Sequence, residues 1–256
     1  MQAFPFPPIA RLAVGHSAEV WACRVAIGSS DTIQAVRIYH IEVGATQQHS
    51  HLVELIRHVG GLSRIAGIAP YLMVDQWQSR SYVVMPLADY DCSRLVESSE
   101  RDGHEHVTNL SSIVQQMALS LDTLGQFSLV HGSVCPAHIL VRDDRAYLIG
   151  FSQMHKLSQR RRQQKCVDLM AHGCMAPEAI AGFPGERSDQ FALAATYLSM
   201  RAGIVPLGET TWVERAMPTL GENERSVVSK ALSVRETDRF ESCSAFSIAL
   251  QRVLFN

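Results

Sequence analysis

Residues 131–153 (HGSVCPAHILVRDDRAYLIGFSQ) gather the side chains of this chain that are best suited to chemistry. His131, Ser133, Cys135 and His138 place two imidazoles, a hydroxyl and a thiol in one short loop. A serine hydroxyl is far less basic than a carboxylate near neutral pH, so Ser133 cannot act as a general base. The acids of the segment are Asp143 and Asp144, and both lie at a predicted turn.

A soft metal such as zinc is the ion that imidazole and thiolate ligands would suit. His131, Cys135 and His138 could converge on such an ion, and further histidines occur at His49, His51, His104 and His106. A structural zinc site takes four ligands, whereas the loop offers two or three, and paired histidines in polar stretches are usually exposed. We therefore expect no metal site.

The elements around this loop follow from the spacing of apolar residues. Residues 139–141, a turn at 143–144 and residues 147–151 predict a β-hairpin. Apolar residues at helical spacing predict helices over 109–124, 191–200 and 241–254. We expect Ser188 to cap the second of these helices. Earlier in the chain, alternating apolar residues predict strands over 12–14, 19–25, 32–39 and within 71–88, and a helix is predicted over 50–59.

The order of these segments and motifs resembles that of the eukaryotic-like (Hanks-type) serine/threonine protein kinases. The family pattern H-R-D-x-K-P-x-x-N-I-L, hairpin, D-F-G keeps its scaffold positions here as His131, Pro136, Ile139, Leu140 and Phe151. The stretch Met175-Ala176-Pro177-Glu178 matches M-A-P-E, and Asp189 and Arg239 match two later positions. The resemblance implies one α+β domain with a two-lobed protein-kinase-like fold. A small antiparallel β lobe with one helix would span about 1–86, a hinge about 86–91, and a larger, mainly helical lobe about 92–256.

The departures from the family pattern fall on residues that carry phosphoryl transfer. The resemblance places them at Arg37 (for the phosphate-binding lysine), Ser133 (for the catalytic aspartate), Cys135 (for its lysine partner), His138 (for the metal-binding asparagine) and Gly150 (for the D-F-G aspartate). Glycine offers no oxygen ligand to Mg²⁺, which prefers carboxylates. We therefore predict a pseudokinase, a regulatory or scaffolding module that binds a protein partner. The alternative is a divergent serine/threonine kinase or nucleotide-binding protein with weak ATP-dependent transfer.

The resemblance also assigns binding and structural positions. A nucleotide pocket would take Gly15, Val20, Ala35, Arg37, Met85, Ala88 and Leu140. The fold would be held by Glu54, His131, Phe151, Glu178, Asp189 and Arg239, with Glu54 pairing with Arg37 and Glu178 with Arg239. No cofactor is required under this hypothesis, although ATP could bind without Mg²⁺.

Composition and charge limit the classes of partner that we expect. The 256 residues are 46% hydrophobic and 19% charged with a net charge of −2. These values are typical of a soluble globular protein and argue against a polyanion-binding surface over the whole molecule, although a local basic patch could still occur. We expect no nucleic-acid partner, no membrane span within this chain and a cytoplasmic location. A protein partner is expected, either an active kinase or a neighbouring domain. A basic stretch could dock an acidic or phosphorylated partner: Arg160, Arg161, Arg162 and Lys165.

Overall fold

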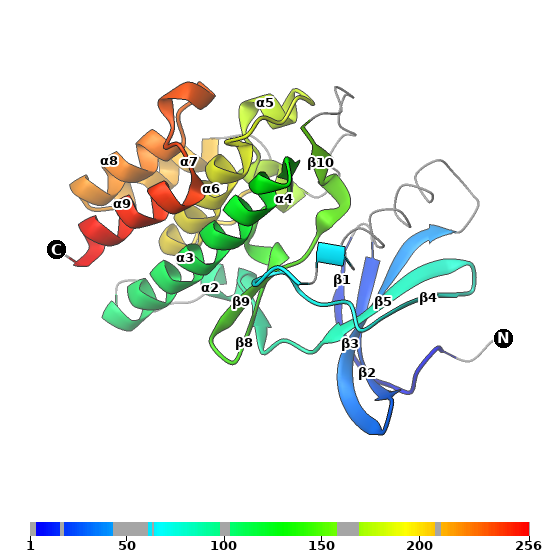
Figure 1. Cartoon of the computed structure of the whole chain (residues 1–256). Coiled ribbons are helices and arrows are strands. Elements are labelled where there is room, and N and C mark those ends of the chain that lie inside the picture. Colours follow the sequence, from blue (N-terminus) through cyan, green and yellow to red (C-terminus); the bar gives the residue numbers. More distant parts are fainter. Residues whose placement is uncertain are drawn as a thin grey trace. The chain divides into compact units, whose positions relative to one another are not determined.

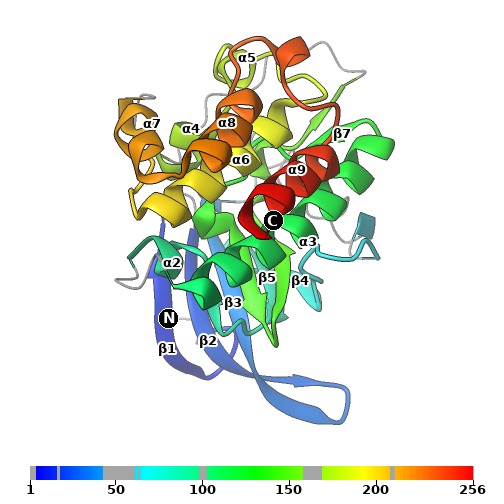
Figure 2. The same ribbon diagram turned by 90° about the vertical axis from the view of Figure 1, so that its left-hand side faces the viewer.

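Five antiparallel strands form the first part of the chain, where the sequence shows alternating apolar residues. The computed structural model describes residues 4–15, 18–42, 61–62, 64–97, 103–157, 169–207 and 211–255. The strands are β1 (Pro8–Val14), β2 (Ala18–Ile27), β3 (Ser30–Glu42), β4 (Met73–Trp77) and β5 (Arg80–Pro86), in the order β1-β2-β3-β5-β4. Figure 2 shows β1, β2 and β3 side by side. The helix predicted over 50–59 lies outside the described residues.

Tight turns join the strands of this sheet. Gly28, with φ of 62°, lies between β2 and β3, and Gln78 and Ser79, with φ of 48° and 60°, lie between β4 and β5. Positive φ at both Gln78 and Ser79 gives that turn a twist that matches the flanking strands. The two hairpins set the register of β2 with β3 and of β4 with β5.

The two faces of this sheet carry different residues because successive side chains of a strand alternate. On one face, a buried apolar cluster comprises Cys23, Val25, Val36, Ile38, Tyr82 and Val84. On the other face, Ala35 lies directly opposite both Ala22 and Met85, and all three are buried. Burial on both faces stabilises the sheet as a unit with its own core.

The second part of the chain is mainly helical. Its longer helices are α3 (His104–Gln126), α6 (Ser188–Ala202), α8 (Glu222–Ala231) and α9 (Cys243–Phe255). Shorter helices are α2 (Ser93–Glu97), α4 (Leu169–Cys174), α5 (Pro177–Ile180) and α7 (Thr211–Ala216). Helix α6 packs against α3, α8 and α9 (Figure 1). Nearly all of its residues are buried. It is therefore the central element of this unit.

Two small sheets flank the loop of residues 131–138. Strands β6 (Tyr90–Asp91), β8 (Ile139–Arg142) and β9 (Arg145–Leu148) form one, and β7 (Leu129–Val130) and β10 (His155–Lys156) form the other. The predicted hairpin is β8–β9. The cap predicted at Ser188 is wrong, because Arg187 is the N-cap residue and Ser188 begins the helix.

Contacts within the chain define two compact units, Met1–Asp89 and Tyr90–Asn256. The first is an antiparallel β unit and the second is mainly helical, which is the α+β class predicted from the sequence. None of the helices in the described part of the chain combines the length and the apolar character that a membrane span needs.

Candidate functional site

The loop that follows β7 is held by the first turn of α6. Asp189 accepts hydrogen bonds from the backbone N–H groups of His131 (2.6 Å) and Gly132 (2.9 Å). Burial raises the pKa of Asp189 to about 6, while the two N–H donors favour its charged form and act in the opposite direction. The structure thus places Asp189 where the kinase resemblance implies, as a brace for the loop backbone.

His131 is fully buried and makes three contacts within the loop region. Its ring lies edge-on to Phe151, with 4.6 Å between ring centroids. Nε2 lies 3.0 Å from the carbonyl oxygen of Ile149, and Nδ1 lies 3.3 Å from the backbone nitrogen of Ser133. Since a carbonyl only accepts, Nε2 carries the proton and Nδ1 accepts from Ser133. Burial lowers the pKa of His131 to about 3, so the imidazole is neutral.

The hydroxyl of Ser133, the residue that the resemblance assigns to the catalytic-aspartate position, is hydrogen-bonded within the protein. The side chain is 1% exposed, and Oγ donates to the carbonyl oxygen of Gly150 at 2.6 Å. The hydroxyl proton is therefore used in a hydrogen bond to the loop that contains Gly150. Ser133 links the two loops that would carry the base and the metal ligand in an active kinase.

His138 and Gly150 are complementary in size. His138 Nδ1 lies 2.7 Å from the carbonyl oxygen of Ser133 and donates to it. Gly150 has φ of 83°, a left-handed conformation that favours glycine. A Cβ atom at residue 150 would lie 2.6–2.7 Å from three atoms of the His138 ring. The imidazole therefore fills the space in which a side chain at residue 150 would begin.

These contacts bear on whether this segment fits a magnesium ion. Gly150 offers no side-chain oxygen, His138 presents a ring nitrogen to a carbonyl, and the Cys135 thiol is fully buried. Mg²⁺ takes oxygen ligands in a nearly ideal octahedron. The residues of this segment do not fit that ion. In the described part of the chain, no three His, Cys, Asp or Glu side chains form a group suited to any metal.

The predicted pocket residues of the first unit lie mostly on one face of its sheet. Val20 lies opposite Arg37, and Ala35 lies opposite Met85. The Arg37 guanidinium carbon is 5.4 Å from the ring centroid of Tyr39. The remaining predicted residues are Gly15, just after β1, and Ala88, just after β5, with Leu140 in β8 of the second unit. Glu54, Arg160, Arg161, Arg162 and Lys165 lie outside the described residues.

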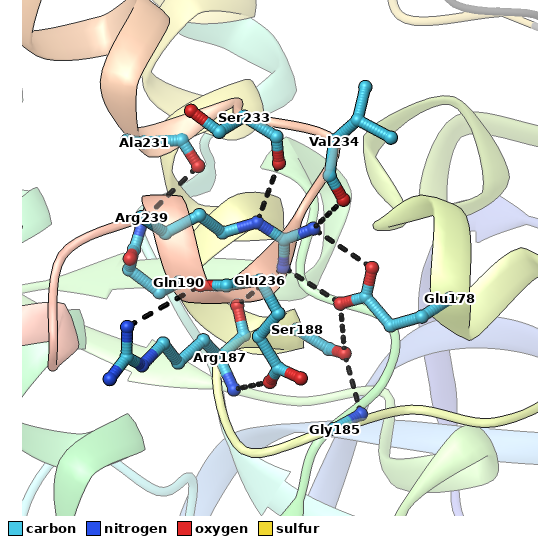
Figure 3. Close-up of polar contacts among 10 residues, drawn as sticks. All are labelled: Glu178, Gly185, Arg187, Ser188, Gln190, Ala231, Ser233, Val234, Glu236 and Arg239. Carbon is cyan, nitrogen blue, oxygen red and sulfur yellow. Dashed lines mark hydrogen bonds and ion pairs between the residues drawn. The ribbon is translucent and has the colours of Figure 1, made fainter.

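The predicted pair of Glu178 and Arg239 is present in the second unit (Figure 3). Arg239 Nη1 and Nη2 donate to the two carboxylate oxygens of Glu178 at 2.7 and 2.8 Å. Arg239 is 3% exposed, and its remaining donors reach backbone carbonyls of Arg187, Ser233 and Val234. The pairing and hydrogen bonding stabilise the buried charge. Hydrogen bonding to Arg239 and Ser188 lowers the pKa of Glu178 despite partial burial.

Glu236 is a member of this network that the sequence did not predict. Its carboxylate accepts a hydrogen bond from the backbone N–H of Arg187. A Cβ atom at Gly185 would clash with the carboxylate of Glu236, which occupies the space beside that glycine (Figure 3). The kinase pattern A-L-x-x-x-P-x-x-R-F has proline where this chain has Glu236. That departure is the sequence feature from which the contact could have been suspected.

Comparison with known proteins clarifies the fold. No protein-family model matches the chain. The kinase domain of PknI from Mycobacterium tuberculosis superposes with a TM-score of 0.67 at 21% identity over 96% of this chain and 95% of that chain. A double mutant of that domain gives 0.68 at 21% identity over 97% and 95%. The chain has a protein-kinase-like fold.

One curated protein adds similarity at the level of sequence. Serine/threonine-protein kinase C of Synechocystis is 24% identical over 172 residues, which are 61% of this chain and 32% of that protein. The aligned region thus spans about a third of that protein's length. The predicted kinase-like fold is confirmed, and the predictions about catalysis, nucleotide binding and partners stay predictions.

Proposed function

We propose that this chain is a pseudokinase, a kinase-like module that regulates or scaffolds by binding another protein and does not transfer phosphate. One observation carries the proposal. The residues at the positions that the resemblance assigns to the base and to two metal ligands contact one another: Ser133 Oγ donates to the backbone carbonyl of Gly150, and the His138 ring fills the space beside Gly150. These groups stabilise the loops of the fold and are unavailable for chemistry.

The size of the expected loss supports this proposal. A general base contributes roughly 10²–10⁴-fold to a rate, and the metal ions neutralise the charge that develops on the transferred phosphoryl group. Ser133 cannot supply the base, and Gly150 cannot supply the ligand. Both losses together leave transfer below detection, whereas the braces at Asp189 and Arg239 keep the fold.

The proposed partner is a protein, either an active kinase or a neighbouring domain of a longer polypeptide, in the cytoplasm. The basic stretch of residues 160–165 would dock an acidic or phosphorylated segment of that partner. No cofactor is required for this role. No nucleic acid is proposed as a partner, because the net charge of −2 gives no general attraction to a polyanion.

The second candidate function is a divergent kinase or nucleotide-binding protein. Arg37 favours it, because a cation lies on the same sheet face as Ala35 and Val20, as the phosphate-binding lysine would. Under this alternative, transfer would need metal ligands recruited from other parts of the chain, whereas ATP binding without Mg²⁺ is compatible with the pseudokinase proposal. Arginine is planar and bulky, however, so it does not reproduce the compact charge of lysine.

Thermal unfolding separates the two candidates. The chain is heated with millimolar ATP, ADP or GTP, each with Mg²⁺ and with EDTA, because a ligand that binds only the folded state raises the midpoint. The proposal expects an unchanged midpoint. A rise that is equal with Mg²⁺ and with EDTA would indicate a structural nucleotide without transfer, and a rise that requires Mg²⁺ would contradict the proposal.

Reconstruction of the catalytic positions is a second test. The variant carries four substitutions: Arg37→Lys, Ser133→Asp, His138→Asn and Gly150→Asp. We expect it to remain inactive in transfer from labelled ATP to a generic protein substrate. Ala13 and Ala18 stand where the family pattern G-x-G-x-x-G-x-V has glycines that let backbone amides approach phosphate, and His172-Gly173 also departs from the family's approach to A-P-E. Robust transfer by this variant would refute the view that the whole site has diverged.

A further inference from the structure

An aromatic surface lies on one face of the first unit's sheet. Trp21 of β2, Trp77 of β4 and Tyr82 of β5 lie on the same face as the buried cluster that includes Val36 and Val84. Residues 4–7 (Phe-Pro-Phe-Pro), which precede β1, pack against this face. We call Trp21, Trp77 and Tyr82 the aromatic platform and residues 4–7 the strap.

Ring contacts attach the strap to the aromatic platform. The ring centroid of Phe4 is 5.3 Å from that of Trp21 and 5.1 Å from that of Trp77. The ring of Phe6 meets Tyr82 edge-on at 5.7 Å. Phe4 and Phe6 are only half-buried. The strap is therefore seated on the platform by two aromatic anchors, separated by a proline.

The backbone of the strap is unsuited to a sheet ladder. Pro5 and Pro7 have no N–H to donate, and the strap's main-chain link is the bond from Arg24 N–H to the carbonyl of Pro7 at 3.0 Å. Proline-rich segments bind aromatic surfaces in extended form because little conformational entropy is left for them to lose. The strap thus has the properties of a bound peptide ligand.

The platform also keeps an unused donor. The indole N–H of Trp21 is buried and has no hydrogen-bond partner among the described residues. Buried indole N–H groups normally find a partner, and a peptide carbonyl is a suitable one. The strap packs against Trp21 without supplying that acceptor. A peptide in a slightly different register could fill the same surface and satisfy the indole.

Charged residues border the platform. The Arg80 guanidinium lies 5.1 Å from the Trp77 ring centroid and 3.5 Å from a carboxylate oxygen of Glu19. The Arg11 guanidinium lies 5.7 Å from the Trp21 ring centroid. Arginine guanidinium groups are attracted to the faces of tryptophan rings. Glu19 and Asp75, which interacts with Tyr82, place carboxylates on the same border, so its charge is mixed.

We propose that the aromatic platform is a docking site for a peptide segment with alternating phenylalanine and proline, and that the strap closes this site in cis. The partner is a protein that displays such a segment. The proposal concerns the first unit alone, so it is independent of whether residues 131–153 can carry catalysis.

A covalently attached strap competes with a free peptide through its high effective concentration, which reaches the millimolar range for short connections. Removing the two anchors of the strap should therefore expose a binding site that the intact protein covers. The vacated variant is the full chain with Phe4→Ala and Phe6→Ala, two substitutions that remove both anchors and leave all strands in place. The single variant Phe4→Ala serves if the double variant unfolds.

The probe is the synthetic peptide acetyl-Phe-Pro-Phe-Pro-Pro-amide, a copy of residues 4–8. The protein is labelled with 5-fluorotryptophan, and ¹⁹F spectra report Trp21, Trp77 and Trp212 separately once each signal is assigned by substitution with phenylalanine. Trp212 is 1% exposed in the second unit and is the internal control. The matched control peptide has alanine in place of both phenylalanines.

We expect the probe to shift the Trp21 and Trp77 signals of the vacated variant in a saturable way and to leave Trp212 unchanged. The intact chain should need about tenfold more peptide, because the strap must first be displaced. The proposal is overturned if the folded variant gives no saturable shift, if the intact chain binds equally well, or if the alanine peptide binds as tightly as the probe.

Discussion

Replacing Gly150 with alanine tests whether His138 has taken the space of the metal-ligand side chain. The substitution adds one methyl group at φ of 83°, within 2.7 Å of three ring atoms of His138. Left-handed strain contributes roughly 1–2 kcal/mol, and the overpacked contact contributes roughly 1–3 kcal/mol more. We expect Gly150→Ala to lower the free energy of unfolding by about 2–5 kcal/mol.

Gly28 provides the matched control. It also has positive φ, of 62°, but a Cβ atom there would meet nothing within 4 Å. Gly28→Ala should therefore cost only the strain, about 1–2 kcal/mol. The small gain that alanine brings by restricting the unfolded chain is common to both variants and cancels in their comparison. The excess for Gly150→Ala is thus the contact with His138.

A double-mutant cycle completes the test. His138→Ala removes the ring, so the methyl group at residue 150 no longer meets it, and the double variant should be more stable than the sum of the single effects predicts. The expected coupling is about 1–3 kcal/mol, measured by urea unfolding followed by circular dichroism at pH 7. Equal costs at Gly28 and Gly150, or strict additivity with His138→Ala, would refute the reasoning.

Two further predictions concern buried charge. Burial lowers the pKa of His131 from its ordinary 6.5 to about 3, so the unfolded chain binds a proton below pH 6.5 that the folded protein does not. The free energy of unfolding is therefore highest above pH 6.5 and decreases as the pH falls toward 3. Between pH 6.5 and 5, the free energy of unfolding, measured with urea, should fall by about 2 kcal/mol more for the wild type than for His131→Gln. Titration of Asp189 changes stability in the opposite direction and does so in both proteins. An equal dependence of stability on pH in the two proteins would contradict a neutral, buried His131. Glu178→Ala should cost about 3–5 kcal/mol by leaving Arg239 buried and unpaired. The double variant Glu178→Ala/Arg239→Met should cost less than the sum of the two single variants, and additive losses in the same assay would indicate that the pair does not act as a unit.

Local sequence patterns predicted much of this fold. Alternation in residues 19–25 and 32–39 gave β2 and β3, and apolar spacing gave α3, α6 and α9, because these periods arise within single elements. The ordered motifs from His131 to Arg239 indicated how the elements connect. The departures at Ser133, His138 and Gly150 were also visible as missing carboxylate and amide groups.

Only the tertiary structure decided what the replacing residues do. That Ser133 bonds to Gly150, that His138 fills the space beside it, and that Glu236 lies against Gly185 depend on segments that meet across the fold. The seat of the strap on Trp21 and Trp77 has the same origin. Local periodicity determines which residues face inward, whereas packing between distant segments determines which neighbour each one meets.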